Sequence, residues 1–349
     1  MEHAAVAPLA KRVRRASSWK LGSICSGIGV CHRAAAVVSK HNPSLDIDFV
    51  FACEHAPYAR RVLAADFPGL PVFGDACEDA VLLPPCDILA AGFPCQPFSS
   101  SNRHRKGSKD SRCTVVMHIL AYIQRVRPRI VIFENVPGIF AWGKDVIQLI
   151  VQTFERCHYR ADIQVLKSHI HGGVPQKRHS VYIVGIWSPT HALIWPRAMP
   201  MQSLPSLMSD EVLQLPGSLP TATKAAAKIK VVETKLAEHG LSAEERSFMV
   251  VNCHSQLGKL FVGTTPCLTA ARGAQGGFWL LGHNRMMSLD ELLRLQGLDP
   301  SSTHMASTVS SRQAGMLIGN CFTLPVVGRV LISALRACGC PVEDSFLAK

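Results

Sequence analysis

A single cysteine between two prolines is the residue of this chain best suited to act as a nucleophile. The segment Phe93-Pro94-Cys95-Gln96-Pro97 follows the apolar run Ile88–Gly92, which predicts a buried strand. Proline fixes its own φ and keeps the preceding residue out of the helical region. We therefore expect the thiol of Cys95 on a stiff loop at the carboxyl end of a strand, the edge at which open α/β sheets bind ligands.

A carboxylate follows another predicted strand. Glu134 comes directly after the apolar run Arg129–Phe133, and parallel strands of one βα series end at the same edge, so we expect it near Cys95. A protease thiol needs histidine, whereas a carboxyl beside a thiolate suits attack on a ring whose nitrogen the carboxyl protonates. The alternative for Glu134 is a structural carboxylate at a strand end.

A third group of residues predicts an adenosine site. The turn Ser26-Gly27-Ile28-Gly29 follows the predicted strand Leu21–Cys25, and its glycines allow the backbone to approach a ligand closely. Glu54 and Asp75 end the next two predicted strands, where they could accept from ribose hydroxyls and an adenine amino group. Each acid alone is better explained as a cap or turn residue; together they indicate adenosine. A triphosphate is not expected, because the chain has no GxxxxGK[ST] motif.

The order of apolar runs predicts an α/β fold with two parts. Strands and helices alternate in the first half, which is typical of a doubly wound, mostly parallel, Rossmann-like sheet. After Trp187 this alternation stops, and residues 188–284 are rich in Pro, Ser and Thr, with one helix expected around Thr223–Glu238. A capping box at Ser288 and Glu291 then opens a helix. We predict a basic tail at 1–19, a main domain at 20–187 plus 285–345, and a small inserted domain at 188–284.

Charge indicates a polyanionic partner. The net charge is +12, which makes nucleic acid the leading candidate, with ordinary solubility charge as the alternative. The loop after Cys95 is itself basic and could both contact phosphates and favour the thiolate. Its basic residues are Arg103, Arg105, Lys106 and Lys109.

The cysteines and the ends of the chain narrow its class further. The thirteen cysteines form no paired CxxC array, so we expect no metal and a reducing compartment. No apolar stretch of ~18 residues is evident, so no membrane span is expected. The basic run Lys11–Arg15 fits a solvated tail, a nuclear import signal or an organelle transit peptide. We expect the nucleus in a eukaryote and the cytoplasm otherwise, with organelle import as an alternative.

Taken together, these motifs resemble the DNA (cytosine-5) methyltransferase family over about residues 20–335. Six blocks stand in the order of that family, and a weaker block, Asp110-Ser111-Arg112, lies between the second and the third. The blocks are Ser26–Gly29, Gly92–Ser99, Glu134–Gly138, Gly173–Arg178, Arg285–Gly297 and Gly319-Asn320.

The resemblance implies S-adenosyl-L-methionine as methyl donor and a cytosine flipped out of duplex DNA as substrate. Cys95 would add to carbon 6 of the ring, Glu134 would protonate nitrogen 3, and Arg178 would contact a phosphate or the base. Asn320 would belong to the block that closes over the cofactor. The inserted segment 188–284 would be the target-recognition domain.

Two positions depart from the family pattern. Cys25 stands where the family usually has an aromatic residue packed on the cofactor, and Ser180 stands where it has a second arginine that touches the 2-oxo group of cytosine. Two alternatives therefore stay open beside a DNA methyltransferase. One is a tRNA cytosine-5 methyltransferase, and the other is a catalytically weak, DNA-binding regulatory homologue.

Overall fold

The computed structural model describes residues 18–100, 102, 104–209, 223–253, 255 and 258–344. Most of the predicted basic tail, including Lys11–Arg15, and Arg103 of the basic loop lie outside these residues. Trp19 is already buried in the first strand, so the folded part begins before residue 20.

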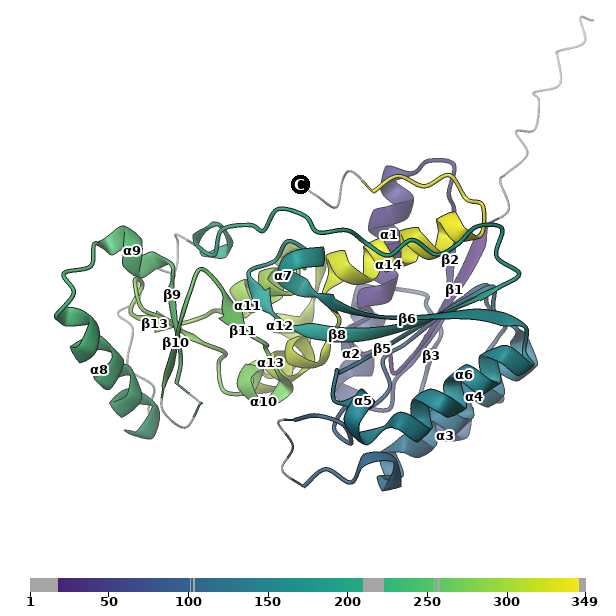
Figure 1. Ribbon diagram of the computed structural model, residues 1–349, viewed down its shortest axis with the longest axis horizontal. Coiled ribbons are helices and arrows are strands. Elements are labelled where there is room, and N and C mark those ends of the chain that lie inside the picture. The colour runs from purple at the N-terminus through teal and green to yellow at the C-terminus, as the bar shows by residue number, and fades with distance from the viewer. Residues whose placement is uncertain are drawn as a thin grey trace, which may run out of the picture.

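The main sheet has the strand order β3-β2-β1-β4-β5-β8-β6 (Figure 1). The five strands β1 to β5 are parallel to one another, whereas β8 runs antiparallel to both β5 and β6. This confirms the predicted mainly parallel α/β sheet. Its strands are β1 (Trp19–Ile24), β2 (Ile47–Cys53), β3 (Val72–Phe73), β4 (Ile88–Ala91), β5 (Ile130–Asn135), β6 (Tyr159–Lys167) and β8 (His179–Trp187).

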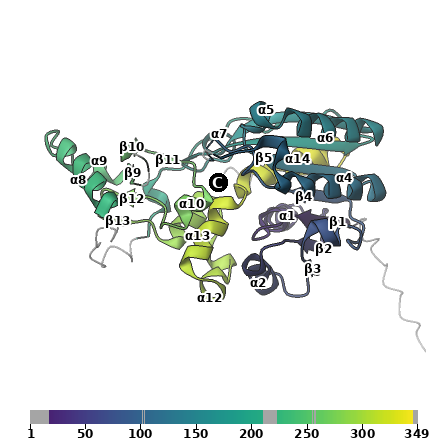
Figure 2. The ribbon, with the colours of Figure 1, turned by 90° about the horizontal axis from the view of Figure 1, so that it is seen from below.

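The sheet is covered on both faces, which explains why its strands are continuous apolar runs. In β5, Ile130 and Ile132 pack into one core while Val131 and Phe133 pack into the other, because successive side chains point to opposite faces. The first core contains α1 (Val30–His41), α2 (Pro57–Asp66) and α14 (Leu324–Ala337). The second contains α4 (Thr114–Val126) and α6 (Lys144–Arg156), which lie on the opposite side of the sheet from α1 and α2 (Figure 2). Ala76 of α3 (Ala76–Asp79) belongs to the same core.

A second, smaller sheet lies at one end of the molecule (Figure 1). Its order is β10-β9-β12-β13, and α8 (Thr223–Ala237) covers it where the sequence predicts a helix. Val250 and Leu280 face the main core, whereas Val251 and Trp279 pack with α8. The sheet is therefore held between α8 and the main domain. Its elements are α9 (Ala243–Ser247), β9 (Met249–Asn252), β10 (Lys259–Val262), β12 (Trp279–Leu280) and β13 (Arg285–Met286).

The segment 188–209, which the sequence assigned to the inserted domain, packs on the main domain instead. The amides of Thr190 and His191 donate to the carbonyl of Ala337 at the end of α14. Leu204 and Leu207 are buried in the main core, the latter within the 3-10 turn η3 (Pro205–Leu207). Its Pro- and Ser-rich composition signals irregular backbone but carries no information about the surface on which that backbone packs.

The remaining elements connect the two sheets and complete the helical layers. β11 (Thr265–Pro266) pairs in parallel with β7 (Gln176–Lys177) and so joins the smaller part of the chain to the main domain. α10 (Ala270–Gly273) crosses α13 (Ser311–Asn320) so closely that a Cβ on Gly315 would lie 2.0 Å from the carbonyl oxygen of Gly273. The others are η1 (Gly107–Lys109), η2 (Ser111–Cys113), α5 (Ile139–Trp142), α7 (Ser168–His171), α11 (Leu289–Leu295), η5 (Pro300–Ser302) and α12 (Met305–Thr308).

One segment does reach the length and apolarity of a membrane span, contrary to the expectation from sequence. Ser311–Ala337 has a mean hydropathy of 1.6, but 72% of that apolar window is buried in the protein. The segment is also divided into α13 and α14 around Cys321–Thr323. Burial of this segment in the main core therefore explains its apolar composition.

A buried ion pair holds the start of α11 against β13. Arg285 donates through Nη1 to Oε2 of Glu291 at 2.8 Å and through Nη2 to Oε1 at 2.7 Å. Glu291 also accepts from the amides of Ser288, in the predicted capping box, and of Ser209. Burial alone would raise the pKa of Glu291, but these hydrogen bonds and the guanidinium lower it overall.

We predict that Glu291→Gln destabilises the protein by about 3–5 kcal/mol, because Arg285 is left as a buried, uncompensated charge. Chemical denaturation measures this loss. Asp290→Asn, a neighbouring exposed change in the same helical turn, is the control and should cost less than about 0.5 kcal/mol. An equal loss in both variants would contradict the role of the ion pair.

Candidate active site

The predicted chemical residues meet at one edge of the main sheet. The turn Ser26–Gly29, Glu54 and Asp75 follow β1, β2 and β3, while Cys95 follows β4 and Glu134 is the last residue but one of β5. Because β8 is antiparallel, its first residues come to this same edge. The edge therefore combines the carboxyl ends of the parallel strands with the amino end of the antiparallel strand β8. Only the carboxyl ends were predicted from sequence.

The Cys95 loop is anchored on both sides of the thiol. Phe93 and Phe98 are buried in the second core, and the ring of Phe93 meets that of Phe133 edge-on at 5.8 Å. The side-chain amide of Asn135 donates to the carbonyl of Phe93 at 3.1 Å. The strand that carries Glu134 therefore also holds the loop that carries Cys95.

Glu134 is buried, and its carboxylate contacts two residues of the β7–β8 segment. The hydroxyl of Ser180 donates to Oε1 at 2.5 Å. Nη2 of Arg178 lies 3.6 Å from the same oxygen. The structure thus brings together Glu134 and Arg178, two predicted catalytic residues, and adds Ser180 to them.

Arg178 is 8% exposed, and its guanidinium is directed inward. Nη1 donates to the carbonyl of Gly319 at 3.1 Å and contacts that of Leu268 at 3.4 Å. A buried cation with these partners is poorly placed to grip a phosphate, which was one of the two roles expected for it. Its contact with a base, the other role expected for it, stays a prediction.

The electrostatic surroundings of Cys95 oppose the thiolate in the free protein. Its pKa is raised to about 11, chiefly by burial and next by the carboxylate of Glu134, while Arg178 acts in the opposite direction. At pH 7 a thiol with this pKa is ionised in only about one molecule in ten thousand. The thiol is therefore quiescent until something changes the charge around it.

We predict that alkylation of Cys95 by iodoacetamide speeds up about tenfold per pH unit from pH 7 to about pH 10, because only the thiolate reacts. A raised pKa leaves the protonated form dominant throughout that window. Site-resolved mass spectrometry separates Cys95 from the other cysteines, and Cys95→Ser identifies its peptide. A rate that levels off near pH 8.5, the ordinary value for a free thiol, would contradict the burial effect.

The first three strand ends bring the Gly27 turn, Glu54 and Asp75 to neighbouring positions at the sheet edge. Gly27 has φ +56°, and a Cβ there would meet nothing within 4 Å, so the turn faces open space. Glu54 accepts from the amide of Gly27 at 2.8 Å and from that of Ala56 at 2.9 Å. These two bonds orient the carboxylate and leave lone pairs for hydroxyl donors. Asp75 caps α3 through Oδ1, which accepts from Cys77, so it is both a cap and a strand-end acid.

The other residues predicted to bind the cofactor lie in different surroundings. Ser26 hydrogen-bonds Ser23 and the backbone of Cys53, which ties the turn to β2. Ile28 is buried in the main core, so only its backbone is available to a ligand. Gly29, at φ +73°, begins α1. Asn320 is exposed at the end of α13, and its part in closing over a cofactor stays a prediction.

We predict that Glu54→Ala weakens binding of S-adenosylhomocysteine roughly ten- to a hundredfold, because a charged acceptor is lost. Isothermal titration calorimetry measures the affinity. Glu78→Ala, an exposed acid on α3, is the matched control and should bind like the wild type. Thermal unfolding checks that both variants are folded. Wild-type affinity in a folded Glu54→Ala protein would refute the assignment.

The basic loop differs in part from its prediction. Arg105 was expected to reach a phosphate, but Nε donates to the carbonyl of Ser99 at 3.0 Å and Nη2 to that of Ser100 at 2.9 Å. Its guanidinium also lies 4.1 Å from the ring centroid of Trp142. Arg105 therefore shapes the loop, whereas Lys106 and Lys109 are the exposed cations of its described part.

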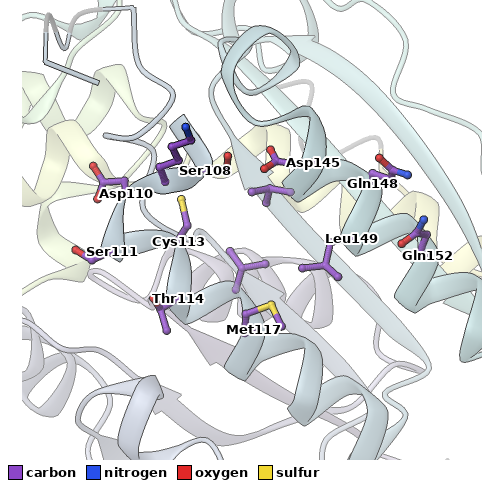
Figure 3. Close-up of a pocket in the computed structure, with 13 residues that line it drawn as sticks. Ser108, Asp110, Ser111, Cys113, Thr114, Met117, Asp145, Gln148, Leu149 and Gln152 are labelled. Atoms are coloured by element: carbon purple, nitrogen blue, oxygen red, sulfur yellow. The ribbon is translucent and has the colours of Figure 1, made fainter. Parts of the chain in front are cut away.

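A groove of about 600 Å³ lies elsewhere, between α4, α6 and the turns η1 and η2 (Figure 3). Met117 is exposed on its wall, and Cys113 and Asp145 point toward it. Cys95, Glu134 and Arg178 do not line it. The predicted chemical groups converge instead at the edge of the main sheet.

Sequence reasoning missed three residues that organise the site. Ser180 was noted only as a missing arginine, and Asn135 only as a neighbour in a motif. Gln176, fully buried, accepts from the amide of Leu268 and donates to the carbonyl of Leu295. A usable signal was present for Gln176 alone, since an amide inside a Gly-Val-Pro-Gln turn between apolar segments needs buried partners.

Solved structures share this fold. A methyltransferase of Entamoeba histolytica, EhMeth, aligns with a TM-score of 0.67 at 15% identity, covering 92% of this chain and 98% of that one. DNMT2 of Spodoptera frugiperda aligns with a TM-score of 0.62 at 17% identity, covering 91% and 100%. The fold is that of the α/β methyltransferases that use S-adenosylmethionine.

The particular family follows from the sequence match. The family model for C-5 cytosine-specific DNA methylases matches residues 19–335, and the chain belongs to that family. It is 34% identical over 142 residues to the type II methyltransferase M.NlaX of Neisseria lactamica, covering 40% of this chain and 45% of that protein. It is 32% identical over 143 residues to M.HhaI of Haemophilus parahaemolyticus, covering 40% and 43%. The matched segments thus span less than half of these relatives.

Proposed function

We propose that this chain methylates carbon 5 of cytosine in duplex DNA through a covalent adduct with Cys95. The observation that carries the proposal is a buried, hydrogen-bonded carboxyl near enough to the Cys95 thiol to raise its pKa, at the edge that also holds the predicted adenosine site. Names of type II methyltransferases among the relatives support DNA. The net charge of +12 supports a polyanionic substrate.

The cradle of Gly27, Glu54 and Asp75 would hold S-adenosylmethionine, which supplies an electrophilic methyl group when bound. Carbon 5 of cytosine is too poor a nucleophile to take that group unaided, and covalent addition removes this obstacle. Flipping the base into the site costs a few kcal/mol, which contacts in the pocket offset.

Addition of the thiolate conserves electrons as follows. A bond forms between Sγ of Cys95 and ring carbon 6, the C5–C6 π pair moves between carbons 4 and 5, and the C4–N3 π pair moves onto nitrogen 3. Nitrogen 3 then takes a proton from the carboxyl of Glu134, which becomes a carboxylate. Carbon 5, now the nucleophilic carbon of an enamine, takes the methyl group. Loss of the carbon 5 proton to solvent then re-forms the C5–C6 double bond and expels Cys95 as a thiolate, and nitrogen 3 returns its proton to Glu134, which restores the aromatic ring.

Glu134 and Cys95 support each other in this step. The carboxylate form of Glu134 raises the pKa of the Cys95 thiol, and Arg178 lowers it. When Glu134 carries the proton that it must donate, its repulsion of the thiolate is absent. The acid form of one residue therefore favours the nucleophilic form of the other.

We further infer that the smaller sheet recognises the DNA site. Its connection β11 pairs with β7, and the next residues on that connection supply the carbonyl of Leu268 to Arg178. α8 carries Lys224, Lys228, Lys230 and Lys235. It packs on the face of the smaller sheet opposite to the main core, so the smaller sheet would combine a basic helix and its own core with a connection that reaches Arg178.

We predict that the purified protein transfers radiolabelled methyl groups to duplex DNA and not to unmodified tRNA. Cys95→Ala should abolish transfer and the covalent adduct with 5-fluorocytosine DNA, while Glu134→Gln should slow turnover about 10²–10⁴-fold through loss of the general acid. Filter binding to DNA should change little in both.

Label in tRNA alone would overturn the choice of DNA. Binding to DNA without label in either polymer would favour the regulatory homologue. Bisulfite sequencing of DNA from a host that expresses the chain then identifies the modified site.

A further inference from the structure

The shortest described contact of the Glu134 carboxylate is made by a neutral residue. Ser180 donates to Oε1 at 2.5 Å, which is in the range of charge-assisted O–H···O⁻ bonds. Arg178, at 3.6 Å from that oxygen, is too distant for a good hydrogen bond. Ser180 and Glu134 are both buried, so their interaction is little weakened by water.

Strand register places Ser180 at this position. Glu134 pairs with Tyr182 and Asn135 with Val181 across β5 and β8, while Ser180 pairs with Leu166 of β6 on the other side. Ser180 therefore stands at the end of the β5–β8 ladder, where its hydroxyl can reach forward to the carboxyl. A buried hydroxyl requires a partner, and Glu134 supplies it.

The two described contacts of Glu134 share one oxygen. Ser180 and Arg178 both approach Oε1, so Oε2 is the oxygen that these contacts leave for a proton. A carboxyl whose one oxygen is fixed in this way cannot rotate freely, and proton donation requires a positioned acid. A hydroxyl achieves this without adding a second positive charge, which would favour the carboxylate over the acid.

We propose that Ser180 is a positioning residue that fixes Oε1 of Glu134 and presents Oε2 to nitrogen 3 of the cytosine. The proposal rests on the proposed function and assigns to Ser180 the place that a second arginine has in the resembling family. On this proposal the serine is a functional replacement for that arginine. The proposal also explains why Cys95 and Glu134 are both retained in this chain.

The test compares Ser180→Ala with Ser180→Thr, which keeps the hydroxyl. We expect Ser180→Ala to lower kcat roughly ten- to a hundredfold, with KM for DNA and for S-adenosylmethionine within about threefold of the wild type. Ser180→Thr should recover most of the rate. Ser168→Ala is the matched control, because Ser168 is also buried and its hydroxyl bonds to Thr323 at 2.8 Å, away from Glu134.

The pH profile distinguishes positioning from a merely structural effect. A hydroxyl that donates to a carboxylate stabilises the charged form, so its loss should move the alkaline limb of the kcat profile to higher pH. The limb should stay in place in Ser180→Thr and Ser168→Ala. The variants leave unchanged the other titratable and charged groups facing Glu134, which are Cys31, Cys95, Arg178, Tyr182 and Cys321.

The outcomes separate the two proposals. A wild type that methylates cytosine, with a folded Ser180→Ala variant of unchanged kcat and unchanged limb, would overturn the role of Ser180 and leave the proposed function standing. A lower kcat in Ser180→Ala with the alkaline limb of the pH profile at its wild-type position would overturn the positioning role. Ser180 would then be a structural residue. A wild type that forms no 5-fluorocytosine adduct and no methylcytosine would overturn the proposed function itself.

Discussion

A buried guanidinium has to be given partners, and Arg178 satisfies this need with three distant parts of the chain. It reaches Glu134 on β5, the carbonyl of Leu268 in the connection from the smaller sheet, and the carbonyl of Gly319 at the end of α13. Leaving such a charge unpaired would cost several kcal/mol. The position of the acid, of the smaller sheet and of the C-terminal helices is therefore tied to one side chain.

At the same edge of the sheet, the buried core holds the loop of the Cys95 thiol in place. Phe93 and Phe98 hold the Cys95 loop in the core, and Asn135 links it to the strand of the acid. Burial keeps the thiol protonated in the free protein because it raises the pKa. The carboxylate of Glu134 acts in the same direction as burial, so the two neighbouring groups are electrostatically coupled.

Much of the main sheet was predictable, and for a local reason. A strand buried on both faces is an uninterrupted apolar run, so β1, β4 and β5 were predicted within two residues of their observed ends. The segment 188–209 was assigned to the wrong part of the molecule, because Pro and Ser report irregular backbone and not its packing surface. Arg105 was misassigned for a related reason: a charge in a loop does not reveal that two carbonyls and Trp142 lie within its reach.

The sequence by itself determined the chemical groups and their order: a thiol between prolines, an acid after a strand, a glycine turn and two further acids, all at parallel strand ends. Only the tertiary structure decided which of their atoms meet. Ser180 lies 46 residues from Glu134, and the two are joined because β8 runs antiparallel beside β5. The periodicity of apolar residues shows which face of a segment is buried. The hydrogen-bond partner of a buried polar atom, by contrast, comes from a segment distant in sequence, and only the folded structure brings the two together.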